Sequence, residues 1–201
     1  LSFDKCKNPD KILANAALAV FYRGDPNEKE KIQEKKASFE ANGATIYLVE
    51  NPITEISSTD LRRMLVFGCV APFIHTDVLS FIHQEGLYHT DEDYRQLPLE
   101  QLEQRVTELL KPSRVAHVLG CRQTAKELAL LYGVDEETAQ RAALLHDITK
   151  ALDGPLQLTL CREYGITLDE FSSKNPKTLH ALTGSLVAQR VFGEDPAVVS
   201  A

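Results

Sequence analysis

The sequence predicts an α/β segment followed by an all-helical domain, with residues 1–90 and 91–201 as separate domains. Two short stretches, an apolar run at 14–22 and a β-branched and aromatic run at 44–49, flank a charged stretch that is typical of a helix. A polar and acidic stretch at 89–98 then interrupts the pattern. Beyond it the apolar residues recur at helical spacing to the end of the chain, which favours a helical second domain.

In the first part, the apolar run 14–22 predicts a buried strand, and residues 23–27 have the composition of a turn. Residues 28–42 predict a charged helix, because an Asn-Gly pair follows as a C-cap would. The run 44–49 predicts a second strand. Strand, helix and strand in this order indicate a parallel α/β unit. The two further helices expected in this part are 58–65 and 76–84.

The second part has a helical pattern punctuated by proline and glycine, which mark the ends of helices. The chain starts at Leu1 and its single methionine is Met64. Its last residues, 196–201, resemble the start of an apolar helix, so we expect a fragment of a longer protein, cut at both ends. The helices expected in this part are 99–110, 113–132, 135–152, 156–164 and 178–192.

Composition narrows the class of protein. The 201 residues are 43% hydrophobic and 25% charged, which is ordinary for a globular protein. A net charge of −7 and a pI near 5.4 argue against a nucleic-acid-binding surface. No apolar run approaches the ~20 residues that a membrane span needs, and no signal-peptide pattern is present. We therefore expect no nucleic-acid and no membrane partner.

The cysteines indicate the compartment. They are widely spaced, without a C-x-x-C pair, and so predict reduced thiols in a cytosolic protein rather than a disulfide framework or a zinc knuckle. A homodimer is left open by these observations. The four cysteines are Cys6, Cys69, Cys121 and Cys161.

The most informative feature is the pair His146-Asp147, which interrupts an otherwise apolar stretch. A carboxylate buried without a partner is costly, and the usual resolution is an ion pair or a metal. His117 lies upstream and His180 downstream, each in a stretch that predicts a helix. This order of residues predicts a metal site. Histidine with carboxylate and no thiolate suits iron, manganese or another divalent transition metal.

Two cations accompany these residues. Lys150 follows His146 by four positions and Asp147 by three, and Arg114 precedes His117 by three, so each shares a helical face with a candidate ligand. Cations beside a metal site indicate an anionic substrate, most simply phosphate. Taken singly, each is also compatible with an ordinary solvated charge.

The run Arg114-x-x-His117, Leu144-Leu145-His146-Asp147-x-x-Lys150 and Leu179-His180 resembles the HD superfamily of metal-dependent phosphohydrolases, and more narrowly the YqeK family. The resemblance covers residues 95–201. It implies hydrolysis of diadenosine tetraphosphate to two ADP.

The resemblance also implies roles for single residues. It makes His117, His146 and Asp147 metal ligands, Asp147 also a proton acceptor, and His180 a ligand of a second metal or of phosphate. Arg114 and Lys150 would stabilise charge on the phosphates. The family carries a further His and a metal-binding Asp on later helices, beyond residue 201, so we expect this fragment to be weak or inactive.

A second motif lies at residues 56–62, Ile-Ser-Ser-Thr-Asp-Leu-Arg. Ser57 or Ser58 is a natural helix N-cap, and we expect Ser58 to be the residue that caps the helix. The backbone N–H groups at a helix start bind anions. Arg62 follows within the first turn and is able to clamp the same phosphate. A helix that is merely capped is the alternative.

The string resembles the signature of nucleotidylyltransferases, especially bacterial nicotinate-nucleotide adenylyltransferase, over residues 1–90. The resemblance implies the C-terminal part of a Rossmann-like domain in which Ser57, Ser58, Thr59 and Arg62 bind the ATP phosphates. The family's Gly-x-Phe-x-Pro and His-x-Gly-His motifs are absent from the 201 residues, so we expect no adenylyl transfer by this part alone. Two alternatives to hydrolysis stay open: adenylyl transfer by the parent protein in NAD biosynthesis, and a non-catalytic nucleotide-binding module.

Overall fold

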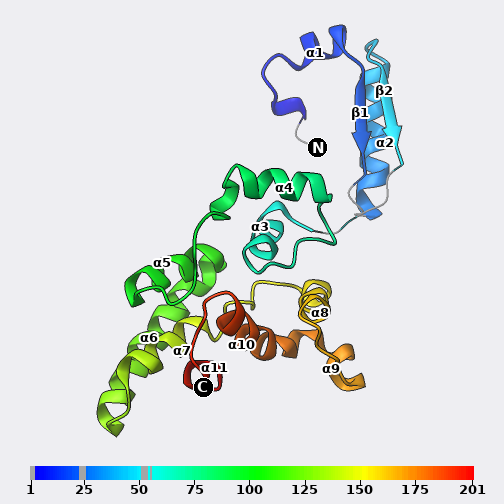
Figure 1. Ribbon diagram of the computed structural model, residues 1–201. Coiled ribbons are helices and arrows are strands. Elements are labelled where there is room, and N and C mark those ends of the chain that lie inside the picture. The colour runs from blue at the N-terminus through cyan, green and yellow to red at the C-terminus, as the bar shows by residue number, and fades with distance from the viewer. Residues whose placement is uncertain (1–2, 23–25, 51–53, 55) are drawn as a thin grey trace. The chain divides into compact units, whose positions relative to one another are not determined.

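The computed structural model describes residues 3–22, 26–50, 54 and 56–201, and forms two compact units, Leu1–Ile56 and Ser57–Ala201. Figure 1 labels the helices and strands of each unit. The division lies earlier than the domain boundary expected near residue 91. The compact units are defined by contacts within the structure, whereas the expected boundary separates two regions that resemble different families. The expected division at 90/91 therefore stays a prediction.

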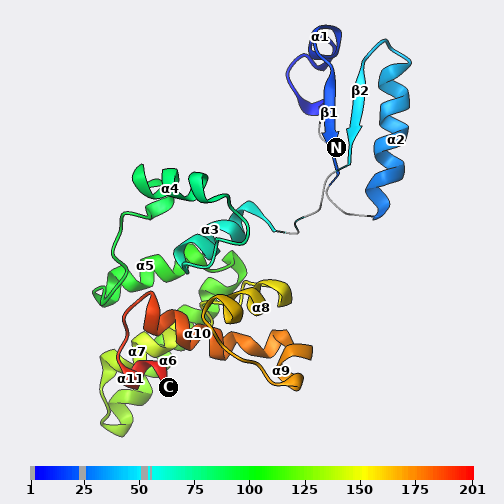
Figure 2. The same ribbon diagram turned by 45° about the vertical axis from the view of Figure 1, so that its right-hand side comes forward.

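The first unit contains the expected strand–helix–strand arrangement. The two strands of its sheet pair in parallel, with Leu18 opposite Ile46 and Phe21 opposite Val49. Figure 2 shows the helix between them in sequence lying alongside the sheet. The parallel unit is therefore confirmed, while its membership of a larger Rossmann-like fold stays a prediction. The elements are η1 Phe3–Lys5, α1 Pro9–Asn15, β1 Leu18–Phe21, α2 Pro26–Glu40 and β2 Ile46–Val49.

The prediction of a buried first strand is wrong. Exposure alternates along β1, so that Leu18 and Val20 are half-buried while Ala19 and Phe21 are exposed. This is the pattern of a sheet with one covered face. The apolar run predicted burial on both faces because composition does not tell which face a neighbour covers. Residues 23–25 of the expected turn lie outside the described part of the chain.

The second unit is helical throughout its described length, as expected. Its core is apolar and takes residues from most of the helices, including Leu102, Val118, Leu144, Leu160 and Val187. None of the described helices is long and apolar enough to cross a membrane. The elements are α3 Ser58–Val66, α4 Thr76–Gln84, η2 Leu87–His89, α5 Leu99–Leu109, α6 Pro112–Tyr132, α7 Glu136–Leu145, α8 Gly154–Glu163, α9 Glu170–Lys174, η3 Pro176–Leu179, α10 His180–Arg190 and α11 Pro196–Val199.

Local sequence explains where α6 and α7 begin and end. Pro112 starts α6, where its missing N–H costs nothing, and Gly133 ends it with a φ of 69° in the left-handed region. The Asp135 carboxylate then accepts a 2.7 Å hydrogen bond from the Thr138 N–H and caps α7. The short connection makes α6 and α7 neighbours, and they pack against each other along the helical unit.

The helix expected at 135–152 is shorter than predicted. It ends at Leu145, and residues 146–150 form consecutive turns. The N–H of Ile148 donates to the carbonyl of Leu145 at 3.0 Å and that of Lys150 to Asp147 at 2.9 Å, three residues back rather than four. Buried Ile148, at 0% exposure, continues the apolar pattern that made the segment resemble one helix.

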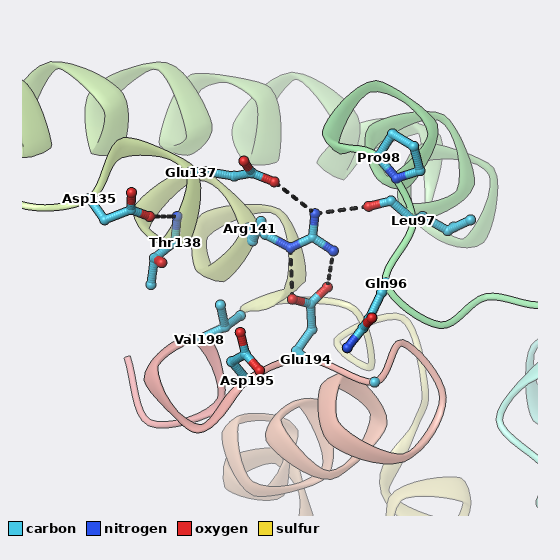
Figure 3. A pocket seen from close by; sticks show the side chains of 11 residues that line it. Gln96, Leu97, Pro98, Asp135, Glu137, Thr138, Arg141, Glu194, Asp195 and Val198 are labelled. Atoms are coloured by element: carbon cyan, nitrogen blue, oxygen red, sulfur yellow. Dashed lines mark hydrogen bonds and ion pairs between the residues drawn. The ribbon is translucent and has the colours of Figure 1, made fainter.

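An ion pair joins α7 to the end of the chain. Arg141 donates to both carboxylate oxygens of Glu194, at 2.7 and 2.8 Å, and to the carbonyl of Leu97 at 2.9 Å. Figure 3 shows these bonds in a hollow of about 430 Å³. The hydrogen bonds to Glu194 raise the pKa of Arg141. The pair therefore ties together three segments that are distant in sequence.

Candidate metal centre

The candidate ligands come from three places in the helical unit. His117 lies on α6, and His146 and Asp147 lie in the turns that follow α7. His180 is the first residue of α10. Because α7 packs against both α6 and α10, these positions converge.

The ligand-type atoms of these residues lie close together. His117 Nε2 is 3.3 Å from His146 Nε2. The Oδ2 of Asp147 is 3.8 Å from His117 Nε2 and 3.6 Å from His146 Nε2. His180 Nε2 is 3.9 Å from the other oxygen, Oδ1. The structure thus brings all four residues together around the carboxylate of Asp147, whose side chain is 5% exposed.

Arg114 balances the charge of this carboxylate. One of its terminal nitrogens donates to Oδ2 of Asp147. Its Nε is buried and has no hydrogen-bond partner among the described residues. A buried donor without an acceptor costs free energy. Arg114 therefore holds Asp147 and retains one N–H for a further acceptor.

Two of the histidines are oriented by the backbone of their own turn. His146 Nδ1 lies 2.6 Å from the carbonyl of Ala143, and His180 Nδ1 lies 2.9 Å from the carbonyl of Lys177. A carbonyl oxygen only accepts, so Nδ1 is the donor in each ring. In each neutral ring Nε2 is then unprotonated, and its lone pair is able to bind a metal or accept a proton.

The side chain of Lys150 contacts His180. Its Nζ is 2.8 Å from His180 Nε2, where the ammonium donates to the ring nitrogen. Both side chains therefore belong to the same edge of the site, next to Oδ1 of Asp147.

A buried polar network holds α10 against the turns after α7. Thr149 Oγ1 donates to the carbonyl of His180 at 3.0 Å and lies 2.8 Å from Thr183 Oγ1. Gln157 donates to the carbonyl of Thr149 at 2.7 Å and accepts from Thr183 at 2.6 Å. Thr149 and Thr183 are fully buried. The network fixes His180 relative to Asp147, and sequence patterns did not single out its members.

Cys121 also lies at the site, although the sequence motif did not point to it. Its Sγ is 3.6 Å from His117 Nε2. The two residues are four positions apart on α6, so they share one helical face. That spacing was the signal available in the sequence. The preference for iron or manganese assumed a donor set without a thiol. The position of Cys121 means that a thiol is present.

The donors present fit a metal ion. Two nitrogens bound to one ion at about 2.0–2.1 Å lie roughly 3 to 3.4 Å apart, and the two Nε2 atoms are 3.3 Å apart. The distances from Oδ2 of Asp147 to these two nitrogens, 3.8 and 3.6 Å, are only slightly longer than the distance between the nitrogens. Imidazole and carboxylate are also the donors that divalent transition metals bind in proteins.

The second motif forms a separate hollow. The prediction that Ser58 caps the helix is wrong, because Ser57 Oγ accepts the 3.0 Å hydrogen bond from the Asp60 N–H while Ser58 is already helical. Ser57 has the extended backbone that an N-cap requires. Ser58 and Arg62 line a hollow of about 420 Å³, and Thr59 and Arg62 line a second of about 510 Å³.

Arg62 is held at these hollows by an aromatic ring. Its guanidinium lies 5.3 Å from the ring centroid of Tyr88, within the range of a cation–π contact. The neighbouring Arg63 is buried and donates to the carbonyl of Leu109 at 2.6 Å. The two adjacent arginines therefore differ in role: Arg63 joins α3 to the end of α5, and Arg62 faces a hollow.

The helical region is similar to a known protein family. Residues 114–200 match the model of the HD domain family. The chain is 33% identical over 102 residues to a symmetrical bis(5'-nucleosyl)-tetraphosphatase from Halalkalibacterium halodurans, covering 48% of this chain and 54% of that protein. It is also 33% identical over 89 residues to a probable nicotinate-nucleotide adenylyltransferase from Clostridium botulinum, covering 44% of each.

A solved structure is similar as well. The crystal structure of a predicted HD superfamily hydrolase involved in NAD metabolism, from Clostridium acetobutylicum, is 31% identical, with a TM-score of 0.49 over 52% of this chain and 56% of that one. The chain spans about half the length of the relatives it matches. The two relatives fit a fusion of an adenylyltransferase-like part with an HD domain, and residues 114–200 are the part that is similar to the HD domain family.

Proposed function

We propose that this HD domain hydrolyses a nucleotide phosphoanhydride, and that the substrate is diadenosine tetraphosphate, cleaved to two ADP. A divalent transition metal would be held by His117, His146 and Asp147. The observation that carries the proposal is their convergence: donors from two elements lie within 3.8 Å of one another around a buried carboxylate.

The residues would divide the work. When bound, the ion supplies a Lewis acid that polarises a phosphoryl oxygen. Arg114 already donates to Oδ2 of Asp147, so Oδ1 is the oxygen that would accept a proton from the attacking water. The buried, unpaired Nε of Arg114 would donate to a phosphate oxygen.

Lys150 and His180 would stabilise the remaining negative charge of the phosphate chain. They lie together at the Oδ1 side of Asp147, where cations favour an anionic transition state. The choice of substrate is supported by the relative named as a symmetrical tetraphosphatase. The division into an adenylyltransferase part, 1–90, and an HD part, 91–201, belongs to the same proposal.

Two measurements test it. The parent protein that contains this chain, incubated with diadenosine tetraphosphate and a divalent transition metal, is expected to yield ADP alone by chromatography. AMP with ATP as products would refute the symmetric cleavage. Metal content is expected to fall in His146→Ala and to stay at the wild-type level in His83→Ala, an exposed histidine on α4. Equal metal content in wild type and His146→Ala would refute the assigned site.

A second function is favoured by the hollow at α3. Ser58 and Arg62 line it at the start of a capped helix, and one relative is named as an adenylyltransferase. We infer that this segment binds the phosphates of ATP within a larger adenylyltransferase. ATP affinity measured by calorimetry is expected to fall in Arg62→Ala. Binding of ATP without either reaction would instead support a non-catalytic nucleotide-binding module.

A further inference from the structure

Cys121 lies beside two of the proposed metal ligands. Its Sγ is 3.6 Å from His117 Nε2. The ligand atoms of His117, Cys121 and His146 all lie within 4.8 Å of one another. Cys121 is also partly accessible, whereas Cys69 and Cys161 are buried. A thiol with this exposure can be reached by an ion from solvent.

We propose that Cys121 is a metal ligand, so that the centre offers a His117–Cys121–His146 face to a thiophilic divalent ion such as zinc. The proposal rests on the proposed metal site but not on the proposed substrate. On binding, the thiol proton leaves to solvent and a sulfur–metal bond forms, as metal binding to cysteine requires.

The geometry favours this ligand set. The i, i+4 spacing on α6 points both side chains the same way, and a rigid helix holds them there. The His146 ring is held by its Nδ1 bond to the Ala143 carbonyl, 2.6 Å long, with Nε2 toward His117. Two ring nitrogens and a sulfur are therefore presented together without rearrangement of the backbone.

The consequence is a change of metal preference. Thiolate is a soft ligand that favours zinc and similar ions, whereas manganese prefers oxygen. The expectation of iron or manganese depended on a donor set without sulfur. With Cys121 included, we expect zinc and cobalt(II) to bind more tightly than manganese.

Cobalt(II) gives a direct test, because a cobalt–thiolate bond produces a near-ultraviolet charge-transfer band. We expect the band in the wild-type protein and its loss in Cys121→Ser. Zinc affinity, measured by competition with a chelator, should fall by at least roughly 10- to 100-fold in Cys121→Ser, since the loss of a group that merely supports a metal ligand already costs that much, with manganese affinity changed much less. Cys6→Ser, which removes an exposed thiol of the other unit, should behave as wild type.

The outcomes separate this inference from the proposed metal site. If Cys121→Ser keeps both the charge-transfer band and the zinc affinity of the wild type, Cys121 is not a ligand. Metal loss in His146→Ala would in that case still support the proposed metal site. A second measurement uses only wild-type protein. Zinc should slow alkylation of Cys121 by iodoacetamide, followed by mass spectrometry, at least tenfold. An equal alkylation rate with and without zinc would overturn the inference.

Discussion

The hydroxyl of Tyr164 donates a 2.8 Å hydrogen bond to the carbonyl of Phe67, across 97 positions of sequence. Tyr164 follows α8 and Phe67 follows α3. The bond therefore joins the segment that carries the serine–arginine motif to the region that matches the HD domain model, within one compact unit. Cys69 lies at the same junction, where its Sγ is 3.4 Å from the Phe67 carbonyl.

Removal of this hydroxyl should weaken the junction. Tyr164→Phe leaves the buried carbonyl with only the weak thiol donor, so we expect a loss of about 1 kcal/mol in the free energy of unfolding. Tyr132→Phe is the matched control, because Tyr132 is 75% exposed. Urea denaturation of the two variants checks this. Equal midpoints would show that the bond adds nothing to stability.

Stability should fall in alkaline solution because of Cys69. Burial raises the pKa of its thiol from 9.0 to about 11. A raised pKa means full stability below about pH 9 and loss as the pH rises toward 11, since only the unfolded state is then deprotonated. The slope should approach roughly 1.4 kcal/mol per pH unit.

Denaturation curves between pH 8 and 11, roughly the window of that titration, measure the effect. Cys69→Ala should flatten the slope but not remove it, because burial also raises the pKa values of Tyr164 and Cys161. Cys6→Ala, at an exposed thiol, should leave the slope as in the wild type. An unchanged slope in Cys69→Ala would contradict the assignment.

The ion pair between Arg141 and Glu194 should be costly to break from one side. The Glu194 side chain is 3% exposed and that of Arg141 is 11% exposed. Glu194→Gln should therefore destabilise by about 3–5 kcal/mol, because a buried charge is left without its partner. Thermal unfolding of the double variant Arg141→Met/Glu194→Leu, in which both charges are removed, tests this explanation. It should be more stable than Glu194→Gln, and a lower stability would argue against the desolvation explanation.

Ser57 and Ser58 should differ although they are adjacent. Ser57→Ala removes the cap of α3 and should cost about 1 kcal/mol of unfolding free energy. Ser58→Ala should cost less than about 0.5 kcal/mol, because its side chain makes no capping bond. Denaturant midpoints compare the two. A larger loss in Ser58→Ala would contradict the assignment of Ser57 as the N-cap of α3.

Lys150 should matter for turnover and not for metal content. Its ammonium contacts His180 rather than the three ligands. In the parent protein, Lys150→Ala should lower kcat roughly 100- to 1000-fold, the range found when a charge-stabilising group is removed. Metal content should stay as in the wild type. Lys126→Ala, an exposed lysine further along α6, is the control for the loss of one surface charge. Metal loss in Lys150→Ala would contradict a phosphate role.

Local signals predicted much of the fold. The helix Thr76–Gln84 has the bounds that the sequence predicted, and both strands occur within the expected runs. The parallel pairing also followed from element order. Where the result depended on a partner across space, prediction failed, as in the half-exposed β1. The end of α7 at Leu145 is of the same kind, because Ile148 keeps the apolar period while the hydrogen bonds change.

The candidate site divides in the same way. The convergence of His117, His146, Asp147 and His180 was predicted from their order and spacing, because ligand residues on packed helices meet. The position of Cys121 was available from its spacing but was not used. The pairing of Thr149 with Thr183, across 34 positions, could not be foreseen, since no local pattern encodes a long-range polar contact.

The bonds from His146 and His180 to carbonyls three residues behind them have a consequence for metal exchange. Both rings are oriented by their own turns, and neither orientation depends on an ion. A chelator should therefore strip the centre without unfolding the helical unit, and a second ion could enter with little loss of conformational entropy. The identity of the ion would then follow supply and ligand chemistry rather than the history of folding.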